Sequence, residues 1–265
     1  MASPDELLPV AVEAVRRAGG IVRDRAPGAV TAKGDRDPAT EVDYAVEREV
    51  REFLLTEAPE VGFLGEEDGR FGAPDAELMW VLDPVDGTVN FMHGVPLCGI
   101  SLGLVRGDRQ VLGVVELPFL GTRYSAFEGG GAYRDGERIG VGKDVRRLAD
   151  AVVALGDYAV GPDAGERNVE RLRTTALLAA SVQRIRMFGS AAIDLVWVAE
   201  GRIAANVMQT NLPWDTAAGV VVAREAGAVV VDQDGNPHTT RSPSTVAVAP
   251  ALRDELLGLL RRRHP

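Results

Sequence analysis

The stretch from residue 79 to residue 90 constrains the fold of this chain most, because it joins an apolar run directly to two carboxylates and a turn. Residues 79–82 are continuously apolar, which is typical of a buried strand, and Asp83 and Pro84 follow, where proline cannot donate to a strand ladder. Gly87 permits a tight turn, so the amides of Gly87 and Thr88 are expected to begin a short helix and to face an anion. The sequence therefore predicts that carboxylates and anion-binding amides share one turn at the end of a strand.

Composition restricts the classes of partner. The 265 residues are 46% hydrophobic, which is enough for one large domain or two fused halves. The formal net charge of −10 argues against a nucleic-acid partner, because binding to a phosphate backbone needs clustered Lys and Arg. The N-terminus is acidic where a signal peptide would be basic, and no apolar run approaches the ~18 residues of a membrane span. We therefore expect a cytoplasmic protein without a membrane partner, whose single cysteine, Cys98, is buried.

Hydrophobic periodicity predicts a mixed fold. A capping box at Ser3 predicts a first helix that runs until Gly28, a turn-rich loop covers residues 33–38, and a second helix follows Thr40. Strand patterns cover residues 97–105, 110–117 and 122–127, and Asp135-Gly136 predicts a hairpin. Strand and helix patterns then alternate from residue 151 to the C-terminus. We expect an α+β or α/β chain with two sheets, organised as an N-terminal half, residues 1–146, and a C-terminal half, residues 147–265.

Four carboxylates are the candidate site residues, because each is flanked by apolar or turn residues that predict partial burial: Glu66, Asp83, Asp86 and Asp215. Four anions gathered in one pocket of low dielectric repel each other unless cations neutralise them. Oxygen ligands without His or Cys favour Mg²⁺, with Mn²⁺ as the substitute, and disfavour zinc. The sequence therefore predicts a magnesium centre.

Structural roles are also expected for Asp215 and for two further acidic residues, Asp43 and Glu67. Asp43 completes a capping box with Thr40, and it is equally a candidate for the periphery of the metal site. Asp215 is expected to cap a helix that begins at Thr216, a role compatible with metal binding. Glu67 is expected to be a solvated neighbour of Glu66.

The motifs resemble those of the inositol monophosphatase family of magnesium-dependent phosphatases. Gly65-Glu66-Glu67, then residues 83–91, then residues 213–219 occur in the order of that family, and the resemblance spans residues 33 to 249. It implies a layered αβαβα sandwich of the inositol monophosphatase and fructose-1,6-bisphosphatase type, a homodimer, lithium sensitivity, and hydrolysis of a small phosphomonoester.

The resemblance also implies a role for each matching residue. Two Mg²⁺ ions, with a third bound loosely through water at Glu66, would be held by Glu66, Asp83, the carbonyl of Val85, Asp86 and Asp215. Thr88 and Glu66 would orient the attacking water, the amides of Gly87 and Thr88 would bind the phosphate, and Asp43 would belong to the outer shell of a weaker ion. Ser190 and Ala191 match the substrate-side segment of the family, although Ser190 equally predicts an ordinary helix cap.

The chain departs from this family on the substrate side. Inositol phosphatases typically carry a glutamate six residues before the tryptophan of their Trp-Asp pair, and counting back from Trp214 gives Met208. Methionine accepts almost nothing from a polyol, and it suits a flatter or more apolar leaving group, such as a nucleoside or a modified sugar. Asn206 or Gln209 restores a polar contact if the local register shifts. We therefore predict that myo-inositol 1-phosphate is not the best substrate, the alternative being an inositol-1-phosphate or histidinol-phosphate phosphatase proper.

Two other hypotheses come from different classes. Haloacid-dehalogenase phosphatases also use an Asp-Gly-Thr motif, but their two aspartates are two residues apart, whereas Asp83 and Asp86 are three apart. Trapping of an aspartyl-phosphate would favour that class. A non-catalytic partner protein that keeps the fold is the second alternative, and silence across a panel of phosphomonoesters would favour it.

Overall fold

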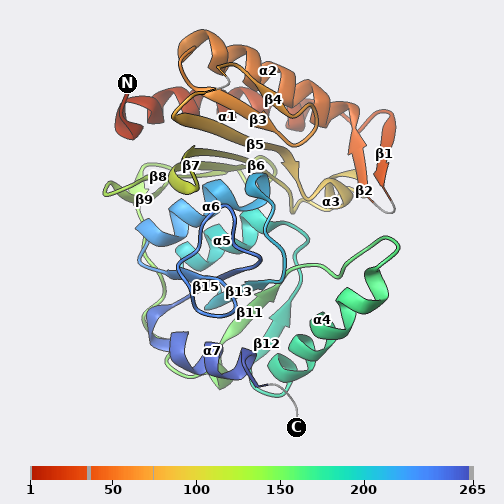
Figure 1. The fold of residues 1–265 in the computed structure, drawn as a ribbon, viewed down its shortest axis with the longest axis vertical. Coiled ribbons are helices and arrows are strands. Elements are labelled where there is room, and N and C mark those ends of the chain that lie inside the picture. Colours follow the sequence, from red (N-terminus) through yellow and green to blue (C-terminus); the bar gives the residue numbers. More distant parts are fainter. Residues whose placement is uncertain (1, 35–36, 74, 263–265) are drawn as a thin grey trace.

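The computed structural model describes residues 2–34, 37–73 and 75–262, which form αβαβα layers (Figure 1). Helices α1 (Pro4–Asp24) and α2 (Glu41–Glu57) cover the outer face of an eight-stranded sheet. Helices α5 (Ala191–Ala199) and α6 (Pro213–Glu225) lie between this sheet and a five-stranded sheet. The layered arrangement that the resemblance implied is confirmed.

The N-terminal segment follows the capping signals but not the predicted loop. The Ser3 amide donates to Glu6 Oε2 at 2.9 Å and completes the capping box, and α1 ends at Asp24, before Gly28. Part of the segment predicted as a loop belongs instead to β1 (Val30–Gly34) and β2 (Asp37–Thr40), in which Thr31 pairs with Ala39. The loop prediction was wrong for residues 33, 34, 37 and 38, because Pro38 lies in a two-stranded pairing, where it displaces no central ladder. Residues 35–36 of the predicted loop lie outside the described residues.

The eight-stranded sheet brings two of the motifs to one edge. Its order is β10-β9-β8-β7-β6-β5-β3-β4, and β3 and β5 run parallel. The strands are β3 (Gly62–Gly65), β4 (Arg70–Phe71), β5 (Leu78–Asp86), β6 (Gly99–Arg106), β7 (Arg109–Leu117), β8 (Thr122–Phe127), β9 (Gly131–Arg134) and β10 (Glu137–Arg138). Because Gly65 pairs with Leu82, the residues that follow, Glu66 and Asp83, lie beside each other at the same end of the sheet.

Strand β5 does not stop at Pro84 as the sequence suggested. It continues to Asp86, with Asp83 paired to Ser101 and Asp86 paired to Gly99, so that two residues of β5 lie opposite one residue of β6. Proline is tolerated at such an irregularity because the ladder is already interrupted there. The bulge keeps Asp83 and Asp86 on one strand and separates them by Pro84 and Val85.

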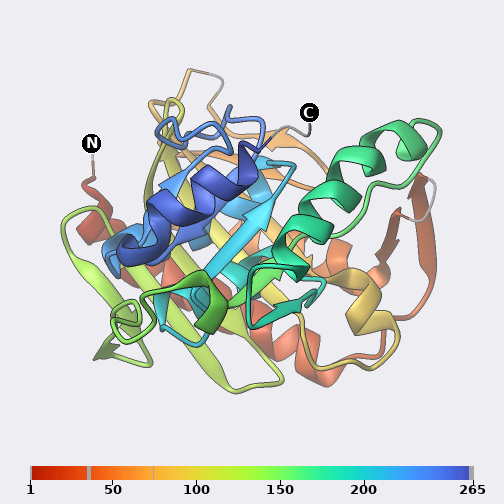
Figure 2. The same cartoon turned by 90° about the horizontal axis from the view of Figure 1, so that it is seen from below.

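The C-terminal half builds the second sheet, in the order β12-β11-β13-β15-β14. Its strands are β11 (Val152–Leu155), β12 (Arg184–Arg186), β13 (Ala205–Met208), β14 (Val229–Val231) and β15 (Thr245–Val248). Helices α4 (Ala164–Ala179) and α7 (Arg253–Leu260) flank this sheet on its far side (Figure 2). The loop that precedes α4 lies near the β1–β2 hairpin in both views (Figures 1 and 2).

Small residues allow α6 to pack closely on the first sheet. A Cβ added at Gly103 would lie 2.6 Å from Ala217 Cβ, and one added at Gly113 would clash with the backbone of Ala218. Strands β6 and β7 therefore present bare backbone where α6 crosses them, and the two halves share one packed interface. The division at residue 146 stays a prediction.

No helix in the described part of the chain is long and apolar enough to cross a membrane. Cys98 is buried, as its apolar neighbours predicted.

We predict that Gly113→Ala lowers the free energy of unfolding by about 3 kcal/mol, because the methyl group must displace the backbone of α6. Urea unfolding followed by circular dichroism measures this. The matched control is Gly20→Ala in α1, where the added Cβ meets nothing within 4 Å and the free energy of unfolding should rise slightly. Equal stability of the two variants would contradict the close packing of α6.

Candidate active site

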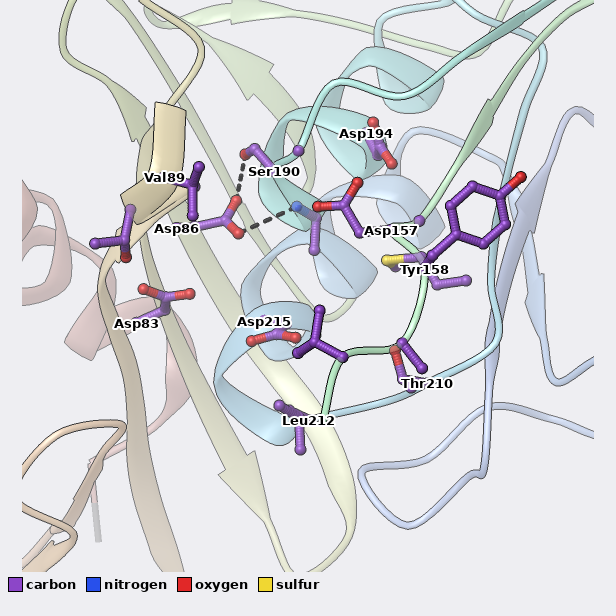
Figure 3. Close-up of a pocket in the computed structure, with 18 of the residues that line it drawn as sticks. Asp83, Asp86, Val89, Asp157, Tyr158, Ser190, Asp194, Thr210, Leu212 and Asp215 are labelled. Carbon is purple, nitrogen blue, oxygen red and sulfur yellow. Dashed lines mark hydrogen bonds between the residues drawn. The ribbon is translucent and has the colours of Figure 1, made fainter. Parts of the chain in front are cut away.

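A pocket of about 370 Å³ is lined by residues from both halves of the chain, and all four candidate carboxylates line it. Asp83, Asp86 and Asp215 are labelled in Figure 3. The first sheet contributes Glu66, Asp83 and Asp86, and α6 contributes Asp215. Carboxylates that are far apart in the sequence therefore line one cavity, as expected for residues of a single site.

The turn between β5 and α3 (Thr88–Met92) has the geometry that the sequence predicted. Asp83 Oδ1 accepts a hydrogen bond from the Val85 amide at 3.1 Å, and Gly87 adopts a φ of 88° as the N-cap of α3. A Cβ at Gly87 would lie 2.9 Å from the carbonyl oxygen of Gly189. Glycine is therefore required both for the left-handed conformation and for the close approach of the C-terminal half.

Asp43 both completes the capping box of Thr40 and contacts the candidate catalytic threonine, Thr88. Its Oδ2 accepts hydrogen bonds from the amide of Thr40 at 2.9 Å and from the Thr40 hydroxyl, so the capping box is real. Its Oδ1 lies 3.2 Å from the hydroxyl of Thr88, which also lies 3.0 Å from the carbonyl oxygen of Val85. A single residue therefore ties the start of α2 to the turn of the site.

Glu47 positions the segment that carries Glu66, and the sequence analysis missed it. Its buried carboxylate accepts hydrogen bonds from the amides of Glu67 at 2.9 Å and Asp68 at 2.8 Å. A Cβ at Gly65 would clash with this carboxylate, so Gly65 is required for the contact. The helical position of Glu47 in α2 shows no local signal for this role, because its partners lie 20 residues away.

Lys33 is the second residue that sequence reasoning missed. Its Nζ lies 2.6 Å from Glu66 Oε1 and 2.9 Å from Glu67 Oε1, so the β1–β2 hairpin reaches the site. The expectation that Glu67 is solvated was wrong, because its side chain is 1% exposed and burial raises its pKa to about 7 despite the hydrogen bond from Lys33. Burial opposes the charge of Lys33, but the hydrogen bonds to both glutamates raise its pKa.

Asp86 joins the two halves of the chain. Its carboxylate accepts hydrogen bonds from the hydroxyl of Ser190, from the amide of Ala191 at 3.1 Å and from the amide of Ala192 at 2.7 Å (Figure 3). Ser190 is also the N-cap of α5, accepting from the amide of Ile193 at 3.2 Å. The helix-cap interpretation of Ser190 is therefore confirmed, and the positive end of α5 faces a carboxylate.

Asp215 lies inside α6 and is not its cap. The helix begins at Pro213 with Leu212 as the N-cap, so the prediction of a helix that begins at Thr216 was wrong. Proline is favoured at the first helical position because its missing N–H would have no partner there. Asp215 consequently lies in the first turn and lines the pocket.

The site carries an excess of negative charge. Burial raises the pKa of Asp83 well above its ordinary value, and the charges of Glu66, Asp86 and Asp215 raise it further. Burial raises the pKa of Asp86 to about 6, although the hydrogen bonds from Ser190 and Ala192 oppose this shift. The first sheet and α6 thus hold mutually repelling carboxylates, an arrangement that favours the binding of cations.

The donor set fits hard divalent ions. Glu66, Asp83, Asp86 and Asp215 offer carboxylate oxygens and Val85 offers a carbonyl, with no His or Cys among them. Within the described ranges, no three Asp, Glu, His or Cys side chains are already grouped closely enough to enclose an ion.

The structure shows where Met208 and the two amide residues near it, Asn206 and Gln209, lie. Met208 ends β13, is 6% exposed and lines the pocket. Asn206 is buried and donates to Asp194 Oδ2 at 2.8 Å, while Gln209 donates to the hydroxyl of Thr174 at 2.9 Å and lines a different pocket. Neither amide replaces a glutamate at this wall. Asp157, which the sequence analysis did not single out, lines it instead.

Comparison with known proteins relates the whole chain to one family. The model of the inositol monophosphatase family matches residues 3–264. The chain is 39% identical over 239 residues to the inositol-1-monophosphatase ImpA of Mycolicibacterium smegmatis, covering 89% of this chain and 84% of that one. It is 36% identical to inositol monophosphatase 1 of Solanum lycopersicum, covering 97% and 96%. The crystal structure of the extragenic suppressor protein suhB from Bartonella henselae superimposes with a TM-score of 0.90 at 32% identity, covering 97% and 99%.

We predict that Glu47→Gln lowers the free energy of unfolding by about 2 kcal/mol, because one of the two amides at Glu67 and Asp68 loses its buried acceptor. Chemical denaturation measures the change. Glu49→Gln on the exposed face of the same helix is the control, and it should change the free energy by less than about 0.5 kcal/mol. An indistinguishable pair of curves would contradict the positioning role of Glu47.

Proposed function

The chain belongs to the inositol monophosphatase family of phosphoric monoester hydrolases, and we propose that it is a Mg²⁺-dependent phosphatase that hydrolyses a small sugar, polyol or nucleoside phosphomonoester by direct attack of water. The observation that carries this proposal is the meeting of Glu66, Asp83, Asp86 and Asp215 in one pocket, beside the turn at Gly87 and Thr88. Family membership opposes the haloacid-dehalogenase alternative, and the intact carboxylates oppose a non-catalytic role.

Each residue of the site has a proposed part in metal binding. Two to three Mg²⁺, or Mn²⁺ in its place, would be held by Glu66, Asp83, the Val85 carbonyl, Asp86 and Asp215, with Asp43 further out. When bound, the ions would neutralise the charge of the phosphoryl group, acidify the attacking water and stabilise the leaving alkoxide. The mutual repulsion of the carboxylates supports this proposal, because the site gains most when cations reduce it.

The remaining groups of the site would bind the phosphate and orient the attacking water. The amides of Gly87 and Thr88 stand at the start of α3 and would donate to phosphate oxygens. The hydroxyl of Thr88 is held 3.2 Å from Asp43 and would orient the water together with Glu66, which Lys33 restrains at 2.6 Å. Holding the water in line with the phosphorus atom lowers the entropic barrier. The amides at the start of α5 hold the carboxylate of Asp86 in place through two hydrogen bonds.

Two finer features rest on the resemblance and on composition alone. We propose a homodimer and a cytoplasmic location.

We predict that Asp83→Asn leaves the fold intact and removes activity at ordinary Mg²⁺ concentrations, because the charge that both ions need is lost. Circular dichroism and phosphate release measure the two effects. Asp254→Asn, on the exposed start of α7, is the control and should leave turnover unchanged. An unaltered turnover number of Asp83→Asn would refute its assignment.

We also predict that myo-inositol 1-phosphate is not the best substrate, because Met208 offers no charged acceptor at the wall where the family typically has one. Comparing kcat/KM for inositol phosphate, histidinol phosphate, fructose bisphosphate and nucleoside monophosphates measures this. A lead of tenfold or more for inositol phosphate would show that Met208 does not determine selectivity.

A further inference from the structure

A second cavity, of about 390 Å³, lies in the C-terminal half of the chain and shares no lining residue with the candidate active site. Its walls come from α4, the end of β13, the turn after β14 and the end of α7. Helices α4 and α7 lie on the same side of the second sheet (Figure 2). Its volume falls within the range of small-molecule sites. The polar residues of the lining include Glu170, Arg173, Thr174, Gln209, Asp234 and Arg261.

Arg173 brings a donor without a partner to this cavity. Its Nη1 lies 3.2 Å from Glu170 Oε2, and its guanidinium group donates to the carbonyl oxygen of Arg262. Its Nε is buried and has no hydrogen-bond partner in the described part of the chain. Buried donors in native structures are nearly always paired, so an unpaired Nε indicates that an acceptor from outside the chain is expected here.

Thr174 provides a second donor of the same kind. The residue is 5% exposed, and its hydroxyl oxygen accepts a hydrogen bond from Gln209 Nε2 at 2.9 Å. Within residues 2–34, 37–73 and 75–262, no group accepts the proton of this hydroxyl. A hydroxyl can donate while it accepts, and buried hydroxyls usually do both. Two consecutive residues of α4 therefore hold donors that lack acceptors at one cavity.

Arg261, just after α7, adds a second cation. It donates to the carbonyl oxygen of Asp234, and it forms no ion pair with any described residue. A Cβ added at Gly235 would lie 2.5 Å from Arg261 Nη2, so glycine lets the guanidinium group lie against the turn after β14. The turn thus holds the charge at the cavity.

The carboxylates of the lining compensate these cations only in part. The Glu170 side chain is 56% exposed, against 23% for its partner Arg173, and Asp234 is also exposed. Water screens the charge of exposed carboxylates, and long, exposed ion pairs contribute little. The unpaired groups of the cavity are donors and cations, so the ligand that fits them is an anion with several acceptor oxygens.

We propose that this cavity is a binding site for a phosphate group, which Arg173 and Arg261 hold together with the hydroxyl of Thr174. The planar fork of a guanidinium group matches two oxygens of a phosphate, and a hydroxyl donor supplies a third contact. The proposal goes beyond the phosphatase function and does not depend on it, because the two pockets have no lining residue in common. The proposed reaction also releases inorganic phosphate, so a ligand of this class would form at the enzyme itself.

The way in which α4 is shared between the pockets supplies a matched control. Arg167 and Arg171 line the candidate active site, whereas Arg173 lines the second cavity. Anion binding at the wrong pocket would therefore respond to a substitution at Arg167 and not to one at Arg173.

The test is isothermal titration calorimetry of inorganic phosphate into the full chain, freed of metal ions on a chelating resin. Without metal, the carboxylates of the candidate active site disfavour an anion. We expect saturable binding of one phosphate per chain, weakened at least about tenfold by Arg173→Gln and by Arg261→Gln, because each variant loses charged hydrogen bonds. Arg167→Gln should leave Kd within about twofold.

Further arms keep the result interpretable. Arg173→Lys retains the charge without the fork, and its Kd should lie between those of the wild type and Arg173→Gln. Circular dichroism checks the fold of each variant, and the exposed Arg261 tests the site even where a change at Arg173 unfolds the chain. Glycerol 3-phosphate in place of inorganic phosphate identifies the source: tighter binding assigns an organic phosphate, and weaker binding assigns free phosphate.

Two outcomes would overturn the proposal: no saturable binding to the wild type, or binding that Arg167→Gln abolishes and Arg173→Gln retains. Neither outcome bears on the phosphatase function, because the titration contains no Mg²⁺ and no hydrolysis is measured.

Discussion

The repulsion among buried carboxylates is the constraint on which the rest of this structure depends. Asp83 and Asp86 are buried on one strand, and the negative charges of Glu66 and Asp215 further destabilise the ionised form of Asp83. Backbone amides close to the two carboxylates stabilise them through hydrogen bonds. The start of α5 donates to Asp86, and the amide of Val85 donates to Asp83. Among the described residues, Lys33 supplies a positive charge at Glu66.

The same requirement explains why the two halves are packed so closely. The amides that stabilise Asp86 belong to α5, in the C-terminal half, whereas Asp86 belongs to β5, in the N-terminal half. The two backbones approach closely at Gly87, where an added Cβ would lie 2.9 Å from the carbonyl oxygen of Gly189, and at Gly103 and Gly113, which face α6. At Gly87 the close packing and the electrostatics of the site coincide, because Gly189 directly precedes the residues that donate to Asp86.

Sequence alone predicted those features that depend on neighbouring residues. The capping boxes at Ser3 and Thr40 and the turn at Gly87 were predicted correctly because each is local. The end of β5 was predicted wrongly, because a bulge against β6 lets the strand pass Pro84, and no local signal shows the partner strand. Glu47 was missed for the same reason, since its role appears only when α2 packs beside the end of β3.

The two walls of the pocket are held in different ways. On the first sheet, the carboxylates of Asp83 and Asp86 accept hydrogen bonds from backbone amides, so a substitution at either residue removes a contact that holds the site. On the opposite wall, several contacts between α4 and the loop after β11 involve the backbone of that loop: Arg171 donates to the carbonyl oxygen of Asp157, and Asn168 contacts the amide and the carbonyl of Ala159. A backbone held in this way places fewer demands on the side chains of the loop. The chain can therefore keep its motif carboxylates while the opposite wall, which includes Met208, varies.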